Sequence, residues 1–391
     1  MLGNSVPAAP ITIMLVCGEP SGDQLGAQLM QALRALGGDS LRIVGVGGPA
    51  MEAQGLKSLF PLSDTAVMGL REVVPKIPAI LRRVREACDF ALATKPNAVV
   101  LIDSPDFTHR IARRLKRLDP SMITINYVAP QVWASRAYRA RKMARYFDLV
   151  LALLPFEAPF FERHGLHSVF VGHPAVERIA RMKGGADLRS RLGIPAGAPL
   201  LAVLPGSRAN EIRFILPPFR EAVALIAERV PGLQTIIAAV PHLTTRLREQ
   251  THGWPAPLHI VESEDDKYAT FNAANAALAA SGTVTTELAL AGTPMVVGYK
   301  LGWLTYTLVR PFVRVQYATL ANLLLDRLAI PEFIQDKCTP QALADAAIAL
   351  LTDKQVREKQ VADLKEAAAR LGLGEQQPSL RAAQAILDFA V

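Results

Sequence analysis

The chain has 391 residues, half of them hydrophobic, and a formal net charge of +8. This length exceeds what one ordinary core organises, so it predicts two domains, and the composition excludes disordered and fibrous proteins. The three cysteines are scattered, which excludes a disulfide framework and fits a reducing cytoplasm. No secretory signal and no membrane-spanning apolar run are present, so we expect a cytoplasmic protein, at most peripheral to a membrane.

In the first half of the chain, short apolar runs alternate with segments that favour helices. We expect strands at residues 11–17, 41–46, 98–102, 122–127, 149–154 and 168–171. Helices are expected over residues 24–36 and 77–92, and again after Ser104, where a capping residue precedes a proline. Residues 18–23 are expected to form the loop after the first strand. This alternation predicts a parallel, doubly wound sheet.

The same pattern restarts after residues 181–199, whose polar, glycine- and proline-rich composition is typical of a linker. Further strands are expected at residues 200–204, 234–239, 259–261, 276–279 and 295–298. The sequence therefore predicts an α/β fold with two Rossmann-like, doubly wound domains facing a cleft, residues 1–180 and 200–338, and a helical C-terminal segment, residues 339–391. Ligands of such sheets bind at the carboxyl ends of the strands.

A strand, a glycine turn and a helix start follow one another at residues 200–212. Gly206 lets the backbone approach a ligand, Ser207 can cap the helix, and Arg208 can bind phosphate oxygens in a bidentate manner. The unpaired N–H groups of the first helical turn add to this positive end. The pattern indicates either an anion site or an ordinary strand-to-helix turn with a surface arginine.

A similar turn follows the strand expected at residues 276–279. Ser281, Gly282 and Thr283 could supply N–H groups and hydroxyls to a phosphate at the start of a helix. Glu287, one turn further, could accept hydrogen bonds from a ribose diol, or it could be an ordinary surface glutamate. Both turns would lie at the carboxyl edge of the second sheet.

Carboxylates follow two strands of the first domain. The segment 18–23, GEPSGD, could cradle a sugar or phosphate, and its glycine spacing differs from the dinucleotide fingerprint. Asp103 ends a fully apolar strand, where it is either a general base or a helix cap. Glu19 and Asp23 are the alternative bases.

The positive charge is concentrated in the first part of the chain, with a net +7 in residues 1–150 and +1 in residues 151–391. Much of the excess lies in the runs 110–117 and 136–145, which are either solvated helix faces or a surface for an anionic partner. Because these runs have few aromatic residues and no nucleic-acid motif, a membrane or anionic substrate is favoured. Residues 301–315 are either an interfacial patch or a buried helix.

Several segments, taken in order, resemble the lipid-A-disaccharide synthase family. The matching segments are 18–23 (GEPSGD), 103–107 (DSPDF), 127–134 (YVAPQVWA), 172–174 (GHP), 204–208 (LPGSR), 281–283 (SGT) with Glu287, and 322–324 (NLL). Two departures are Ala321, where the family pattern leads us to expect proline, and Ser135-Arg136, where it leads us to expect a second tryptophan. They affect local loop shape and leave the implied reaction unchanged.

The resemblance implies an inverting glycosyltransferase of the GT-B type. The first domain would face the acceptor and membrane, and the second would bind the donor, UDP-2,3-diacylglucosamine. The acceptor would be 2,3-diacylglucosamine 1-phosphate (lipid X), and the products the β-1,6-linked disaccharide 1-phosphate of lipid A synthesis and UDP. Such an enzyme would act at the cytoplasmic face of the inner membrane of a Gram-negative bacterium. Its partners would be these substrates and the anionic membrane surface, and it would use no nucleic acid, cofactor or metal. The resemblance leaves open whether the enzyme forms a homodimer.

The resemblance places the catalytic aspartate at Asp103, a UDP-binding arginine at Arg208 and a further essential asparagine at Asn322. The predicted donor site comprises Gly206, Ser207, Arg208, Glu211, Ser281, Gly282, Thr283, Glu287 and Asn322. The predicted acceptor site comprises Gly18, Glu19, Ser21, Gly22 and Asp23. Two alternatives are another UDP-sugar transferase or epimerase of this architecture, and a non-catalytic protein that binds anionic lipid or nucleic acid.

Overall fold

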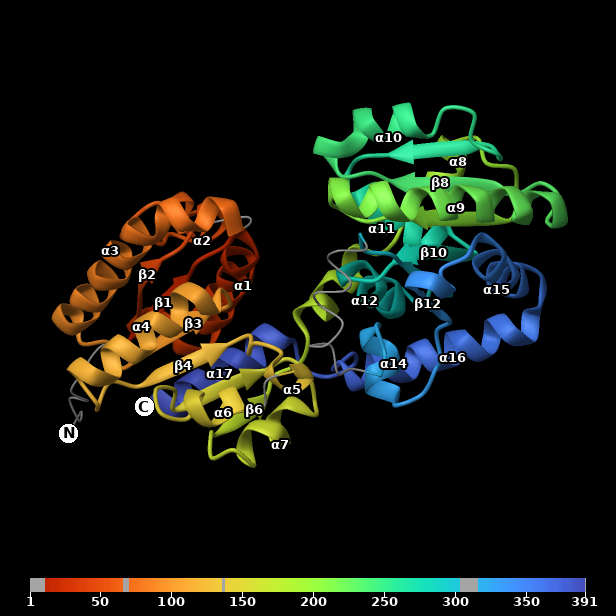
Figure 1. Ribbon diagram of the computed structural model, residues 1–391. Coiled ribbons are helices and arrows are strands. Elements are labelled where there is room, and N and C mark those ends of the chain that lie inside the picture. The colour runs from red at the N-terminus through yellow and green to blue at the C-terminus, as the bar shows by residue number, and fades with distance from the viewer. Residues whose placement is uncertain (1–10, 66–69, 136–137, 303–315, 391) are drawn as a thin grey trace. The chain divides into compact units, whose positions relative to one another are not determined.

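The computed structural model of the protein describes residues 11–65, 70–135, 138–302 and 316–390. The chain forms two units, each with its own hydrophobic cores. Unit 1 comprises Met1–Pro174 and Glu375–Val391, and unit 2 comprises Ala175–Gly374. Within the described residues, each unit contains one parallel six-stranded sheet with helices on both faces (Figure 1). This is the doubly wound α/β class that the alternating pattern predicts.

The sheet of unit 1 has the strand order β2-β1-β3-β4-β5-β6. Its strands are β1 (Ile11–Cys17), β2 (Leu41–Val46), β3 (Ala98–Ile102), β4 (Thr124–Tyr127), β5 (Leu149–Ala152) and β6 (Ser168–Phe170). Cys17 at the end of β1 pairs with Ile102 at the end of β3. The residues that follow these two strands therefore start side by side.

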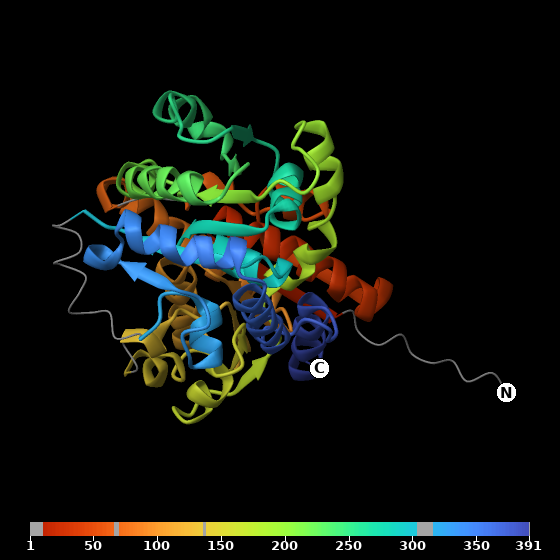
Figure 2. The ribbon, with the colours of Figure 1, turned by 90° about the vertical axis from the view of Figure 1, so that its right-hand side faces the viewer.

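Two layers of helices cover this sheet. The helices of unit 1 are α1 (Pro20–Gly37), α2 (Pro49–Ala53), α3 (Leu70–Thr94), α4 (Pro105–Leu118), α5 (Val132–Ser135), α6 (Tyr138–Met143), α7 (Glu157–Glu162) and α17 (Pro378–Ala390), with short 3-10 turns at Gly38–Ser40 and Leu62–Asp64. Side chains of α1, α2 and α17 pack on one face, and those of α3, α4 and α6 on the other. The C-terminal helix α17 lies against α1, as the turned view shows (Figure 2).

The sheet of unit 2 has the order β12-β11-β10-β7-β8-β9. Its strands are β7 (Leu200–Leu204), β8 (Gln234–Ala238), β9 (Leu258–Val261), β10 (Ala276–Ala280), β11 (Met295–Tyr299) and β12 (Glu332–Ile334). The strands β7 and β10 are fully buried and consist of apolar residues alone, as expected for central strands of a parallel sheet.

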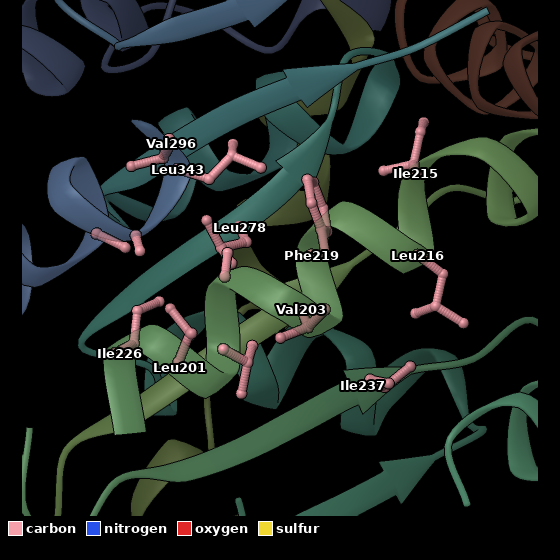
Figure 3. Packing of buried hydrophobic residues seen from close by; sticks show 14 of the residues in the cluster. Leu201, Val203, Ile215, Leu216, Phe219, Ile226, Ile237, Leu278, Val296 and Leu343 are labelled. Carbon is pink, nitrogen blue, oxygen red and sulfur yellow. The ribbon is translucent and has the colours of Figure 1, made fainter. Parts of the chain in front are cut away.

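The helices of unit 2 also form two layers. They are α8 (Gly185–Arg191), α9 (Ala209–Arg229), α10 (Thr244–Gln250), α11 (Glu264–Ala273), α12 (Thr283–Ala291), α14 (Leu320–Leu325), α15 (Pro340–Thr352) and α16 (Lys354–Arg370), with 3-10 turns at Pro174–Arg181, Pro241–Leu243 and Gln335–Lys337. In one layer, Phe219 and Ile226 of α9 and Leu343 of α15 pack on Val203 and Leu278 of the sheet (Figure 3). This packing holds the turn after β7 against a rigid core.

The division into units differs from the predicted boundaries at 180, 200 and 339. Residues 181–199 form part of unit 2, because Met182, Leu188 and Ile194 are buried in its core. The helical C-terminal region is divided between the units: α15 and α16 pack in unit 2, whereas Ala383 and Ile386 of α17 are buried in unit 1. The composition of residues 181–199 predicts a linker because the segment has few apolar residues. Those few residues nevertheless pack in the core of unit 2.

Three local expectations also change. Helix α1 begins at Pro20, so Ser21, Gly22 and Asp23 lie in its first turn and not in a loop. Ser104 and Ser207 do not cap helices with their side chains: Ser104 Oγ bonds elsewhere, and α9 begins after Arg208. The short strand β12 was not expected from its sequence, and most of the expected 301–315 patch lies outside the described residues.

Strand order places a topological switch point in each sheet. In unit 1, the chain leaves β1 for β2 on one side and returns for β3 on the other. In unit 2, it leaves β7 for β8 and β9 and returns for β10 on the opposite side. Ligands of doubly wound sheets bind at such points because the connections diverge there and leave the carboxyl ends open.

Candidate active site

A cavity of about 460 Å³ lies at the switch point of unit 2. Eight of the nine residues predicted for the donor site line it: Gly206, Ser207, Arg208, Glu211, Ser281, Gly282, Thr283 and Glu287. The turns after β7 and β10 thus meet, as their place at the carboxyl ends of adjacent strands requires. The volume is in the range of cavities that hold a small-molecule ligand.

The turn after β7 is arranged around the carboxylate of Glu211. Its Oε2 accepts hydrogen bonds from the backbone N–H of Ser207 (2.9 Å) and of Arg208 (3.2 Å), and its Oε1 accepts one from Arg208 Nη1 (2.8 Å). Gly206 has φ +115°, and a Cβ there would lie 2.5 Å from Glu211 Oε2, so a side chain would disrupt this turn. Three N–H donors therefore converge on one carboxylate, which is the chemistry of an anion site.

The turn after β10 presents the start of helix α12 to the same cavity. Gly282 is the N-cap of α12, and Thr283 begins its first turn, where N–H groups lack intrahelical acceptors. Ser281 does not turn its hydroxyl toward this helix start, since its Oγ donates to the carbonyl of Ala318 (2.9 Å). The backbone of this turn, more than its side chains, is available to an anion.

Glu287 is a buried carboxylate held by two cations. Its side chain is 2% exposed, its Oε1 accepts a hydrogen bond from Arg178 Nη1 (3.0 Å), and Lys267 Nζ lies 2.6 Å from its Oε2. A buried charge requires such partners, so the surface-glutamate alternative is wrong. All three residues line the cavity.

Asn322 is the predicted donor residue that the structure places behind the cavity. It is completely buried; its Nδ2 donates to Ile330 O (2.8 Å) and to Glu332 Oε1 (2.7 Å), and its Oδ1 accepts from two backbone N–H groups. The Glu332 carboxylate also binds the N–H groups of Ala318 and Thr319. Because the Ala318 carbonyl holds Ser281, Asn322 supports the cavity wall through this chain of contacts.

At the switch point of unit 1, the side chain of Asp103 lies beside the first turn of α1. Its Oδ2 accepts a hydrogen bond from Ser21 Oγ (3.0 Å), and its Oδ1 accepts one from the backbone N–H of Ser104 (2.8 Å). Ser104 Oγ donates in turn to Glu19 Oε1 (2.8 Å). The structure thus brings Glu19 and Ser21 to the segment Asp103-Ser104, more than 80 residues away in the sequence.

The backbone at Asp103 is strained. Asp103 has φ +53° and Ser104 has φ +47°, both in the left-handed region that residues with a Cβ avoid at roughly 1–2 kcal/mol each. The strand-to-helix connection passes close to Gly18, where a Cβ would lie 2.7 Å from Ser104 Oγ. Strain of this kind, at a switch point, is common where a side chain must be held for function.

The two remaining acidic residues of the segment 18–23 differ in environment. Glu19 is exposed at the N-terminus of α1. Asp23 is buried, and its carboxylate accepts hydrogen bonds from the N–H groups of Gly48, Ala50 and Met51 at 2.8–3.0 Å. The structure therefore favours a role for Asp23 in fixing the start of α2 over the predicted contact with the acceptor. Gly22 is likewise buried, next to Cys17.

Three polar residues that line the unit 2 cavity were not predicted from the sequence. Tyr299 ends β11 and could have been found by the rule that ligands bind at strand ends. Arg178 lies in a 3-10 turn of the segment before the predicted linker, and Lys267 lies in α11. Only the fold brings these two cations to Glu287.

Within the described ranges, no group of three or more His, Cys, Asp and Glu side chains is placed to hold a metal ion. Among the helices that the structure describes, none is long and apolar enough to cross a membrane. In the unit 2 cavity, cations and backbone amides could contact an anionic ligand.

Two Rossmann-like units, one with a cationic cavity at its switch point and one with a held carboxylate, define the GT-B class of enzymes that act on nucleotide-activated sugars. Solved structures share this fold: UDP-GlcNAc 2-epimerase from Neisseria meningitidis, bound to UDP-GlcNAc, matches with TM-score 0.61 and 11% identity over 97% of this chain and 99% of that one. MurG from Acinetobacter baumannii matches with TM-score 0.57 and 17% identity over 97% and 100%.

The sequence model of the family described as Lipid-A-disaccharide synthetase matches residues 13–386. A lipid-A-disaccharide synthase from Rhodospirillum centenum is 46% identical over 97% of this chain and 94% of that protein. A second, from Paramagnetospirillum magneticum, is 43% identical over 96% and 97%. The chain belongs to the lipid-A-disaccharide synthase family, and is therefore a glycosyltransferase of lipid A synthesis.

Proposed function

We propose that the protein transfers the 2,3-diacylglucosamine group of UDP-2,3-diacylglucosamine to the 6-hydroxyl of 2,3-diacylglucosamine 1-phosphate (lipid X). The products are the β-1,6-linked disaccharide 1-phosphate and UDP. Family membership supports the lipid A disaccharide as product. The observation that carries the mechanism concerns Asp103 at the switch point of unit 1, which has a strained backbone and a hydrogen-bonded carboxylate.

The unit 2 cavity would bind the UDP part of the donor. The amides of Ser207 and Arg208 and the guanidinium of Arg208 already hold one anionic group, the Glu211 carboxylate, and the diphosphate would take its place. The start of α12 would add a second set of N–H donors, and Glu287 would bind the ribose hydroxyls. Asn322 and Glu332 would position the Ser281 turn.

Asp103 would act as the general base. A sugar hydroxyl is a weak nucleophile near pH 7, so a carboxylate within hydrogen-bond reach should remove its proton during attack. The acceptor oxygen then bonds to the anomeric carbon of the donor, opposite the departing UDP, and the electron pair of the broken C–O bond goes to the diphosphate. Attack from the opposite face inverts the α-linked donor to a β-linked product. Ser21 would hold the Asp103 carboxylate in place.

The experiment is a UDP-release assay with the purified protein and both acylated glucosamines, followed by mass spectrometry of the lipid product. We expect UDP and a tetraacyl disaccharide 1-phosphate only when both substrates are present. Interconversion of the UDP-sugar without acceptor would instead indicate an epimerase of the same fold. Absence of UDP release with both substrates, together with binding of the lipids, would indicate a non-catalytic lipid-binding protein.

We further propose that unit 1 associates with the cytoplasmic face of the anionic inner membrane. The support is the net +7 of residues 1–150 and the exposed side chains of Arg117, Arg141 and Arg145 on and beside α4 and α6. Replacing these three by glutamate should weaken sedimentation with phosphatidylglycerol vesicles, at about 1 kcal/mol for each cation near the surface. Equal binding by this variant and the wild type would place the contact elsewhere.

A further inference from the structure

Unit 1 has a second cavity, of about 540 Å³, next to the segment that holds Asp103. Its wall begins at Pro105, the first residue of α4, and continues along that helix to Arg113. Residues of α6 and the nearby Pro130, Val132 and Tyr146 complete it. The mechanism above does not use this cavity, although it borders the proposed base.

Four cations face this cavity. Asp106, His109, Arg110 and Arg113 follow the i, i+3, i+4, i+7 spacing of one helical face. Arg139 and Lys142 join them from α6. In the part of the chain that the structure describes, none of these arginines or this lysine lies within ion-pair distance of a carboxylate. The cavity therefore has an excess of unneutralised positive charge.

A buried imidazole lies in the same wall. His109 is 6% exposed, and its Nδ1 lies 3.2 Å from the hydroxyl of Tyr146. That hydroxyl accepts a hydrogen bond from Arg113 Nη2 (3.2 Å), so its own proton is free to point at Nδ1. Burial, and then Arg113 and Arg139, lower the pKa of His109 to about 3, so the ring is neutral at pH 7.

With Nδ1 accepting from Tyr146, the single proton of the neutral ring resides on Nε2. This Nε2 is buried and has no hydrogen-bond partner. A buried donor without an acceptor is unfavourable by about 1–3 kcal/mol, and a bound acceptor removes that cost. His109, one of the residues that line the cavity, therefore carries an unpaired N–H donor.

We infer that this cavity binds a phosphate monoester, and that the group it takes is the anomeric phosphate of the acceptor sugar. The second clause rests on the proposed function. A phosphate monoester carries up to two charges and several acceptor oxygens, which suits four cations and one N–H donor better than a single carboxylate does. The donor diphosphate already has its own site in unit 2.

The position of the cavity fits this assignment. In the acceptor, the attacking 6-hydroxyl is attached through C6 to C5 and the 1-phosphate is attached to C1, and these two carbons flank the ring oxygen. In unit 1, Asp103 and the cavity are separated by the single residue Ser104 before Pro105, and His109 lies about 6 Å further along the axis of α4. The sugar ring would therefore lie between Asp103 and the cations. The cavity would select a phosphorylated acceptor and align its 6-hydroxyl with Asp103.

The test compares two variants that remove the same charge from unit 1. The cavity variant is Arg110→Gln/Arg139→Gln/Lys142→Gln, and the control is Lys57→Gln/Arg82→Gln/Arg85→Gln, at positions outside both the cavity and the proposed membrane contact. All six side chains are exposed, so both variants should fold. Each is assayed in detergent with 2,3-diacylglucosamine 1-phosphate and with the same lipid lacking the phosphate.

We expect the cavity variant to raise the KM for the phosphorylated acceptor on the order of 10–100-fold, to leave the KM for the UDP-sugar unchanged, and to abolish the preference for the phosphate. The control should behave as the wild type. An unchanged preference in the cavity variant, or an equal loss in both variants, would overturn the inference. Weaker vesicle binding with an unchanged acceptor KM would also overturn it, because the cations would then serve lipid headgroups.

A measurement without turnover separates this inference from the proposed function. Glucosamine 1-phosphate should bind the wild type in calorimetry and should shift the Nε2 signal of His109 in a protein labelled with 15N-histidine. Both effects should be lost in the cavity variant, and glucosamine should produce neither. If the wild type binds this probe but releases no UDP, the phosphate site stands and the proposed reaction fails. If glucosamine 1-phosphate binds both variants equally, the site is wrong.

Discussion

The two switch-point sites stand in parallel, doubly wound sheets of different strand order and carry opposite chemistry. In unit 1, the residues after β1 and β3 bring together the carboxylates of Glu19 and Asp103 with serine hydroxyls. In unit 2, the residues after β7 and β10 bring together Arg208, backbone amides and two helix starts. The fold therefore supplies the position of each site, and the side chains decide whether the site is acidic or cationic.

The backbone conformation of the two switch-point turns differs in line with this difference in side chains. At the switch point of unit 2 the residue with positive φ is Gly206, whose missing side chain lets a phosphate approach the backbone. At the switch point of unit 1 the residues with positive φ are Asp103 and Ser104, where glycine would relieve strain but, at Asp103, would remove the proposed base. An anion cradle requires an absent side chain at the turn, whereas a general base requires one that is held.

The largest effect is expected when the acidic site of unit 1 loses its carboxylate. Asp103→Asn keeps size, hydrogen-bonding shape and tolerance of the left-handed backbone, but cannot accept the proton. We expect turnover to fall about 10²–10⁴-fold, with unchanged thermal unfolding and unchanged UDP affinity in calorimetry. Asp89→Asn, an exposed carboxylate on α3, is the matched control. Near wild-type turnover would make Asp103 a structural residue and pass the role to Glu19.

The second-largest effect is expected at the cationic site of unit 2. Arg208 is 80% exposed, so Arg208→Ala should leave the fold intact. We expect both weaker UDP binding and a barrier higher by about 2–4 kcal/mol, because charge grows on UDP as it departs. Arg208→Lys should restore only part of the activity, since lysine lacks the planar fork. Arg213→Ala, on the same helix, serves as the control. Wild-type kinetics of Arg208→Ala would leave this arginine without a catalytic role.

A smaller effect concerns the pH dependence of unit 1. Burial lowers the pKa of His109 from 6.5 to about 3, so this group stabilises the fold above pH 6.5, and that contribution is lost as the pH falls toward 3. Arg113 and Arg139 contribute to the same shift. The stability advantage of the wild type over His109→Gln should therefore shrink below pH 6.5, by at most ~1.4 kcal/mol per pH unit. Calorimetric unfolding between pH 4 and 7 measures it, and a constant difference would contradict it.

The last prediction is that removing divalent metal ions leaves turnover unchanged. If amides and Arg208 neutralise the diphosphate, turnover should be the same after dialysis against EDTA as before. The assay is UDP release with and without added Mg²⁺. Loss of activity in EDTA that Mg²⁺ restores would mean that the cationic site is incomplete without a metal ion.

Much of the candidate site could be predicted from the sequence, because its parts are short and local. The turns at Gly206 and Ser281 and the carboxylate of Asp103 each follow an apolar strand, and ligands of parallel sheets bind at strand ends. Local sequence patterns give no information on burial, so they did not indicate that Asp23 and Asn322 are buried. The structure shows the Asp23 carboxylate and the Asn322 carboxamide hydrogen-bonded to backbone groups.

The sequence by itself determined the fold class, since periodic apolar runs specify strands and helices, and it determined the family through ordered motifs. Only the tertiary structure decided which strands are neighbours, and so which turns meet at a switch point. It also decided that Arg178 and Lys267 bind Glu287, and that α4 and α6 form one cationic cavity. The physical reason is that charge pairing and burial depend on distance in space, which local sequence patterns do not contain.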